Sequence, residues 1–100
     1  MTETQLKIKI IRAIRKEFPT TFFYKASDNF FSGIPDLIGC HRGVFFAMEI
    51  KTPIGKVSRI QEFTMKKINA CGGYAGVVRT VVEALELLLS IDRSISILKQ

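Results

Sequence analysis

The sequence has little cysteine and no long hydrophobic run, and each scarcity excludes a class of protein. Its two cysteines, Cys40 and Cys71, lie far apart and form no Cys-x-x-Cys pair of the kind that binds zinc. We therefore expect two reduced thiols in the core of a cytoplasmic protein, rather than a disulfide. No apolar stretch approaches the ~20 residues that cross a bilayer, and the N-terminus lacks the basic-then-apolar order of a signal peptide.

Acidic residues are also scarce relative to basic ones. The 15 lysines and arginines against 9 aspartates and glutamates give a formal net charge of +6. This balance favours a polyanionic partner, of which nucleic acid is the commonest, although a charge that serves only solubility is the alternative. With 100 residues, 47% of them hydrophobic, the chain is long enough for a single domain, 1–100, with a substantial core.

Capping boxes and residue periodicity predict the secondary structure. A hydroxyl residue followed three positions later by Glu or Gln occurs at Thr2, Ser58 and Thr80, and is typical of a helix start. Helices are expected over 2–18, 59–70 and 81–89, and strands over 21–24, 35–41, 44–51 and 74–79, with 94–97 as a possible further strand. The order α-β-β-β-α-β-α favours an α/β sandwich around a mixed sheet.

The large apolar residues are expected to fill the core. The first helix carries a stripe of apolar residues at a spacing of four, and the second helix has an apolar side. The residues assigned to the core on these patterns are Leu6, Ile10, Ile14, Phe18, Ile60, Phe63 and Ile68, and most of Phe22, Phe23, Phe30 and Phe31. The segment from Asn29 to Gly33 is also a candidate loop for reaching DNA bases.

Arg42-Gly43 is a candidate two-residue hairpin turn between the second and third predicted strands. With that turn, Asp36 lies directly opposite Glu49, and Lys51 projects from the same face of the sheet. A three-residue loop would instead send Asp36 to the other face, unless a bulge restored the register. The single histidine, His41, adjoins the turn and is interpreted as a solvated turn residue rather than a general base.

Two carboxylates placed together among apolar strand residues need a group that neutralises them. A divalent cation with oxygen ligands does this, and Mg²⁺ usually takes only one or two carboxylates. The alternative is an ordinary salt bridge from Lys51 to Glu49 or Asp36. Spacing alone leaves both interpretations open.

The motifs Gly33-Ile34-Pro35-Asp36 and Glu49-Ile50-Lys51 resemble the PD-(D/E)xK nuclease motif. The chain from Glu3 to about Leu88 looks like the VRR-NUC family of virus-type replication-repair nucleases, which are related to archaeal Holliday-junction resolvases. Further matching segments are Lys56-x-Ser58-x-x-Gln61, Gly72-Gly73 and Tyr74-Ala-Gly-Val-Val-Arg79. The resemblance implies a restriction-endonuclease-like fold.

The resemblance also implies roles for individual residues. Asp36 and Glu49 match the ligands of Mg²⁺ or Mn²⁺, assisted by the backbone carbonyl of Ile50, and Lys51 matches the residue that orients or activates water. Glu3 matches an acidic residue near the metal, although it also suits the first turn of a helix. The polar residue that the family contributes from the helix after the hairpin corresponds to Gln61, which its capping box explains equally well.

The resemblance implies a DNA endonuclease, selective for branched or flapped DNA and acting as a homodimer. Candidate phosphate-binding residues are Lys56 and Arg59 after the hairpin, and Arg12, Arg15 and Lys16 on the first helix. The apolar tail, with Ile91, Ile95, Ile97 and Leu98, is a second reason to expect a dimer. The alternatives are a catalytically inactive nucleic-acid-binding module of the same fold, and a structural partner of a larger replication assembly.

Overall fold

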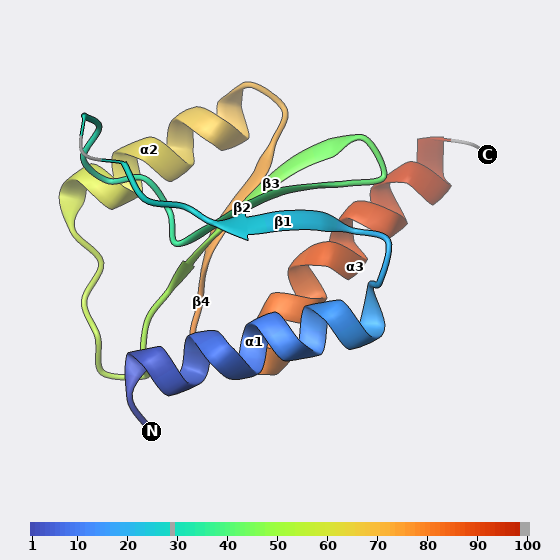
Figure 1. The fold of residues 1–100 in the computed structure, drawn as a ribbon. Helices are drawn as coiled ribbons and strands as arrows, with labels where there is room; N and C mark the ends of the chain where they lie inside the picture. The colour runs from blue at the N-terminus through green and yellow to red at the C-terminus, as the bar shows by residue number, and fades with distance from the viewer. Residues whose placement is uncertain (29, 99–100) are drawn as a thin grey trace.

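The computed structural model describes residues 1–28 and 30–98, and shows the expected order of elements around one mixed sheet (Figure 1). Asn29, named above as part of a DNA-contacting loop, lies outside the described residues. The elements are α1 (Glu3–Glu17), β1 (Phe22–Lys25), β2 (Leu37–His41), β3 (Val44–Ile50), α2 (Arg59–Ala70), β4 (Tyr74–Val78) and α3 (Val81–Leu98). The α/β fold class is confirmed.

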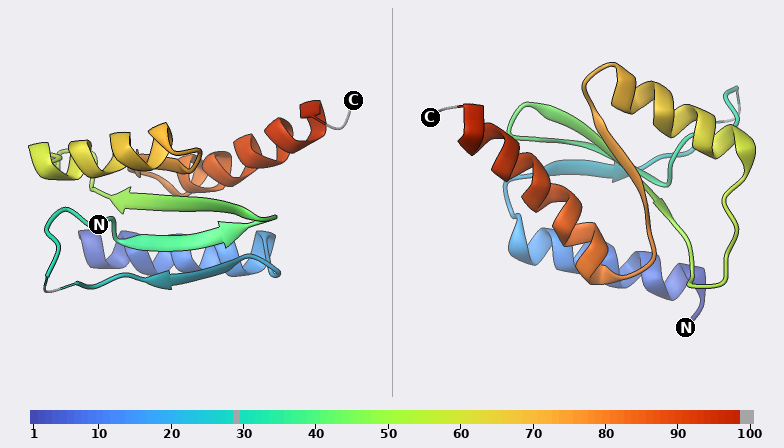
Figure 2. Two further views of the ribbon diagram at one scale, coloured as in Figure 1. Left: turned by 90° about the horizontal axis from the view of Figure 1, so that it is seen from above. Right: turned by 180° about the vertical axis from the view of Figure 1, so that it is seen from behind.

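The sheet has the strand order β1-β2-β3-β4, with β1, β2 and β3 antiparallel and β4 parallel to β3. Figure 1 views it nearly edge-on, with α2 above it and α1 and α3 below it, and Figure 2 shows α2 beside β4, away from β1. No helix within residues 1–28 and 30–98 is long and apolar enough to cross a membrane.

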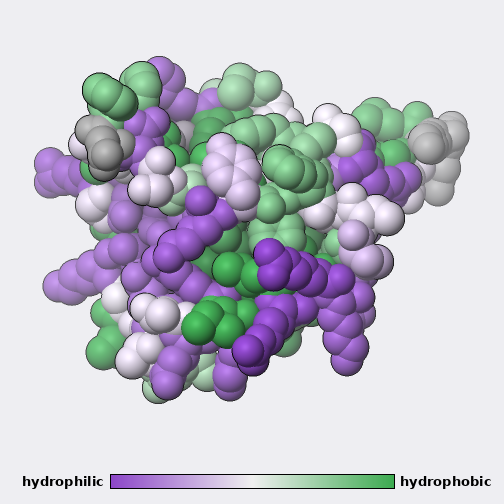
Figure 3. Space-filling model, viewed as in Figure 1, coloured by the Kyte–Doolittle hydropathy of each residue, from purple (hydrophilic) through white to green (hydrophobic). Residues whose placement is uncertain are grey.

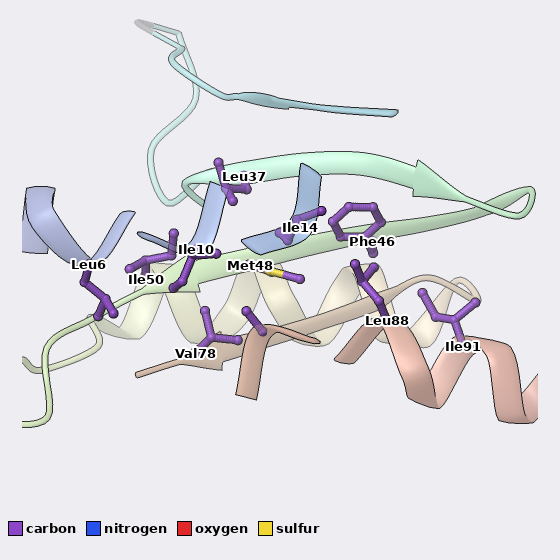
Figure 4. Packing of buried hydrophobic residues seen from close by; sticks show 11 residues of the cluster. Leu6, Ile10, Ile14, Leu37, Phe46, Met48, Ile50, Val78, Leu88 and Ile91 are labelled. Carbon is purple, nitrogen blue, oxygen red and sulfur yellow. The ribbon is translucent and has the colours of Figure 1, made fainter. Parts of the chain in front are cut away.

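The main core lies between the sheet and the pair α1 and α3. Because side chains alternate along a strand, Phe46, Met48 and Ile50 of β3 all point to this side and are fully buried. Figure 4 shows them meeting side chains from both helices. The helical members of this core are Leu6, Ile10 and Ile14 of α1 and Ala84, Leu88 and Ile91 of α3. The expected stripe on the first helix is confirmed.

The prediction of a possible strand over 94–97 is wrong, because α3 continues through these residues to Leu98. The apolar period of the helix also continues, since Ile91 is fully buried and Ile95 packs against the core. Isoleucine and serine suggested a strand locally, but packing on the sheet decided the conformation. Of the apolar tail, only Ile97 and Leu98 remain largely exposed.

The expectation that most of the phenylalanines and both cysteines are core residues is also wrong. Phe23 packs against the core, whereas Phe22, Phe30 and Phe31 are exposed. Ile60 and Phe63 of α2 are exposed as well, and Met65 is the residue of α2 that is buried. Cys40 and Cys71 are free, as expected, but exposed. The position of α2 leaves the β1 side of its sheet face uncovered, and this exposes Phe22 and Cys40.

His41 is buried at 5% exposure and is not a solvated turn residue. Its Nδ1 lies 2.6 Å from Thr21 Oγ1, and its Nε2 lies 2.8 Å from Asp92 Oδ1. Phe18 contacts the ring edge-on, with 5.2 Å between ring centroids. Because side chains alternate along β2, His41 points to the core side of the sheet. There it connects the segment just before β1 with α3. The clasp formed by His41, Thr21 and Asp92 therefore connects three parts of the fold.

Candidate active site

The hairpin between β2 and β3 has the two-residue turn that the sequence suggested. His41 pairs with Val44, and Leu37 pairs with Met48. Arg42 and Gly43 both have positive φ, at 52° and 83°, as a type I′ turn requires. The register that places Asp36 beside Glu49 is therefore present.

Asp36 and Glu49 lie together at the end of this hairpin. Glu49 projects from β3 on the α2 side of the sheet, and its side chain is only 4% exposed. Asp36 precedes β2, and its Oδ2 accepts a hydrogen bond of 2.7 Å from the backbone N–H of Ile50. This hydrogen bond fixes the Asp36 carboxylate against β3, next to Glu49.

The two carboxyl groups have opposite pKa shifts. Burial, together with hydrogen bonding to Asp36 and its charge, raises the pKa of Glu49 to about 8. Burial opposes ionisation of Asp36 as well, but hydrogen bonds from Glu49, Ile50 N–H and Lys7 outweigh it and lower the Asp36 pKa. The pair therefore retains a proton near neutral pH when no cation is bound.

Lys51 lies where the hairpin register predicts. Its backbone N–H donates to the carbonyl of Val78, 3.1 Å away, which keeps the chain beside β4 just past the end of β3. Its Nζ is 3.9 Å from Glu49 Oε1, and the side chain is 17% exposed. The ammonium group is therefore close to the carboxylate pair and still reachable from solvent.

Lys7 of α1 is a member of this site that the sequence interpretation missed. Its Nζ lies 3.0 Å from Asp36 Oδ1 and 3.5 Å from Glu3 Oε2. Burial alone would lower the Lys7 pKa, but hydrogen bonding to Asp36 and its charge raise it. The spacing of Glu3 and Lys7 indicates their ion pair, whereas the contact with Asp36 arises only from the packing of α1 under the sheet.

The carboxylate pair fits a divalent cation. Glu49 Oε2 is buried and has no hydrogen-bond partner among the described residues, an arrangement that costs free energy unless a cation or proton satisfies it. Within residues 1–28 and 30–98, no three His, Cys, Asp or Glu side chains form a metal-holding group. Two carboxylates suit Mg²⁺, which keeps several waters. Glu3 is connected to the pair only through Lys7.

Gln61 lies in the first turn of α2, and the predicted phosphate-binding residues lie next to that turn or on α1. The side chain of Gln61 accepts a hydrogen bond from Ser58 N–H at 3.0 Å, completing the capping box of α2. Lys56 and Arg59 are exposed just before and at the start of α2, and Arg12, Arg15 and Lys16 are exposed on α1.

Arg79, at the end of β4, fixes the loop that carries Lys56. It donates from Nη1 to the carbonyls of Thr52 and Gly55, both at 2.7 Å. The sequence does not indicate this role of Arg79, because its acceptors are backbone carbonyls, which every residue has.

Comparisons with known proteins support the fold. No family model and no curated protein matches the chain. A solved structure described as "VRR_NUC domain" is similar, with a TM-score of 0.67 and 22% sequence identity. The similarity covers 88% of this chain and 96% of that one. The fold expected from the resemblance is therefore confirmed.

Proposed function

We propose that residues 1–100 form a single nuclease domain of the VRR-NUC type, which hydrolyses DNA phosphodiester bonds as an Mg²⁺- or Mn²⁺-dependent endonuclease. The observation that carries the proposal is the pair of Asp36 and buried Glu49, with an oxygen of Glu49 that has no partner among the described residues and the ammonium of Lys51 beside it. The fold shared with a solved VRR_NUC domain supports the same reaction class.

In this proposal Asp36 and Glu49 hold the metal ion, with the carbonyl of Ile50 as a third ligand. The bound ion supplies a water of lowered pKa and neutralises charge on the phosphate. Lys51 holds the attacking water or stabilises the negative charge that develops on the phosphate oxygens. The hydrogen bond from Ile50 N–H to Asp36 orients that carboxylate before any ligand arrives. Gln61 is proposed to contribute a polar contact at the start of α2.

The proposed substrate is branched or flapped DNA. The net charge of +6 favours a polyanion, and the exposed Lys56 and Arg59 follow soon after β3 in the sequence. Arg79 keeps the loop of Lys56 in place. Arg12 and Lys16 are proposed to form a second phosphate-binding cluster. We further propose a homodimer, with the exposed Ile97 and Leu98 at the end of α3 in its contact region.

A panel of branched, flapped and linear DNA substrates, each incubated with Mg²⁺ or Mn²⁺, tests this function. The wild-type protein is expected to cleave a branched or flapped substrate faster than linear duplex, and EDTA is expected to stop the reaction. Asp36→Asn should remove cleavage while leaving the melting temperature of the protein close to that of the wild type. Full activity of Asp36→Asn would overturn the proposal.

Lys7 favours a second candidate, a nucleic-acid-binding module without catalysis, because its ammonium already neutralises Asp36. The substitution Lys7→Met separates the two candidates. If the site holds a metal, removing this competing cation should enlarge the rise in melting temperature that Mn²⁺ produces, and should lower the melting temperature in EDTA. An inactive module predicts that Mn²⁺ shifts neither protein and that no substrate is cut.

A further inference from the structure

We propose that one part of the sheet surface binds single-stranded DNA and leads it to the carboxylate pair. This part belongs to the same face of the sheet as α2, but lies toward β1, where α2 does not cover it. We call this surface the aromatic face, and define it by Phe22 and Tyr24 of β1 and Phe45 of β3. The choice of DNA rests on the function proposed above, whereas the binding itself does not require catalysis.

The strand register puts the aromatic face and the carboxylate pair on the same side of the sheet. Phe22 pairs with Cys40, which pairs with Phe45, so these side chains form one row across three strands. Tyr24, Ile38 and Ala47 form the next row, two residues further along each strand. The hairpin register continues to Asp36 and Glu49 in the row after that. The rows therefore progress from aromatic residues to the proposed catalytic residues in steps of ~7 Å.

The aromatic side chains are open to solvent to an unusual degree. Phe22 is 66% exposed, Tyr24 is 53% exposed and Phe45 is 44% exposed. The rings of Phe22 and Tyr24 lie 6.1 Å apart, with an angle of 51° between their planes. Figure 3 shows hydrophobic residues gathered on this side of the molecule, above β1. An exposed cluster of this kind marks an interaction surface rather than a core.

α2 borders the aromatic face at its C-terminal end, where Ile68 and Phe45 line the same pocket, and it carries several exposed cations. The Ile60 end of α2 lies against the loop before β2, since the backbone at Gly33 approaches Ile60 closely. One turn further, Lys67 Nζ lies 5.6 Å from the centre of the Phe63 ring. Arg59 and Lys66 add further exposed cations on the same helix, against one exposed acid, Glu62. Aromatic rings bordered by cations suit bases and phosphates together.

At the end remote from Asp36, the surface is hollowed next to Phe45. A pocket of about 570 Å³ is lined there mainly by apolar atoms, from Gly43, Val44, Phe45, Ile68, Cys71, Gly72 and Gly73. It offers room for a base beyond the row of Phe22 and Phe45. A second copy of this chain is a poorer occupant of the aromatic face than DNA, because each domain carries a net charge of +6 and DNA is a polyanion.

The experiment measures the affinity of the metal-free protein for a fluorescein-labelled oligothymidylate in EDTA, by fluorescence anisotropy. Phe22→Thr and Tyr24→Thr remove the ring while introducing a β-branched residue, which suits a strand. Each is expected to weaken binding by about 5- to 150-fold, the range for losing one base-stacking contact. Val82→Thr is the matched control, because Val82 is 74% exposed on α3 and outside the aromatic face. It should bind like the wild type.

Phe45→Thr on β3 gives an independent readout if a β1 variant fails to fold, which melting curves reveal. Wild-type affinity of folded Phe22→Thr, Tyr24→Thr or Phe45→Thr would overturn the inference. So would a change from dimer to monomer with unchanged DNA affinity, because the aromatic face would then bind a second copy. If these variants lose binding while the wild-type protein cleaves nothing, the nuclease proposal fails and this inference stands.

Discussion

Glu49→Gln is expected to raise the melting temperature of the metal-free protein at pH 8 while abolishing cleavage. The pKa of Glu49 is raised from 4.5 to about 8 in the folded state, so folding favours its protonated form. The corresponding stability is fully present below pH 4.5 and is lost as the pH rises through about 8. Glutamine keeps the shape without ionising, and about 1–3 kcal/mol of stability at high pH is the expected gain.

Melting curves in EDTA between pH 5 and 9 measure this effect. The wild-type protein should lose stability over that interval more steeply than Glu49→Gln, and added Mn²⁺ should restore the wild type but not the variant. Glu62→Gln, which changes an exposed carboxylate of α2, is the matched control and should follow the wild-type curve. Parallel curves for wild type and Glu49→Gln would contradict the raised pKa of the buried Glu49 carboxyl group.

Lys51→Ala is expected to slow cleavage by roughly 10²–10³-fold, the cost of losing one group that stabilises charge in a transition state. Its ammonium is 3.9 Å from Glu49 but is not a metal ligand. The Mn²⁺ concentration that gives half of the melting-temperature shift should therefore change only a few-fold. Lys51→Arg should not restore the rate, because a planar guanidinium cannot take the position of a compact ammonium.

Lys56→Ala is the matched control for Lys51, since it removes an exposed lysine from the adjoining loop. It should weaken DNA binding and reduce the salt dependence of that binding, while the rate at saturating DNA stays near the wild-type value. If both lysine variants show the same modest loss, Lys51 binds phosphate and has no special part in the chemistry.

The hairpin was predictable because two local features fix it. Arg42-Gly43 sets the turn, and the two-residue period of a strand then determines which residue faces which. From these rules alone, the sequence places Asp36 beside Glu49 and puts Lys51 on the same face. The helix starts at Thr2 and Ser58 were predictable for a similar reason, because each capping box involves residues only three positions apart.

The features that the sequence did not predict depend on tertiary packing. Lys7 reaches Asp36 because α1 packs under the sheet, and no local pattern contains that distance. Phe22 was assigned to the core because it is aromatic, whereas α2 leaves its part of the sheet uncovered. His41 adjoins a turn, but its partners Thr21 and Asp92 come from opposite ends of the chain. In each case the residue type can be read from the sequence, whereas the residues that pack against it in the fold cannot.

The clasp around His41 has a consequence for how the protein tolerates insertions. Loop tips usually accept extra residues. Here a one-residue slip of β2 against β3 would move His41 away from Thr21 and Asp92 and also turn Asp36 to the face opposite Glu49. A slipped hairpin therefore loses stability and the proposed activity in the same event. The contacts of His41 thus stabilise the same β2–β3 register that places the two carboxylates together.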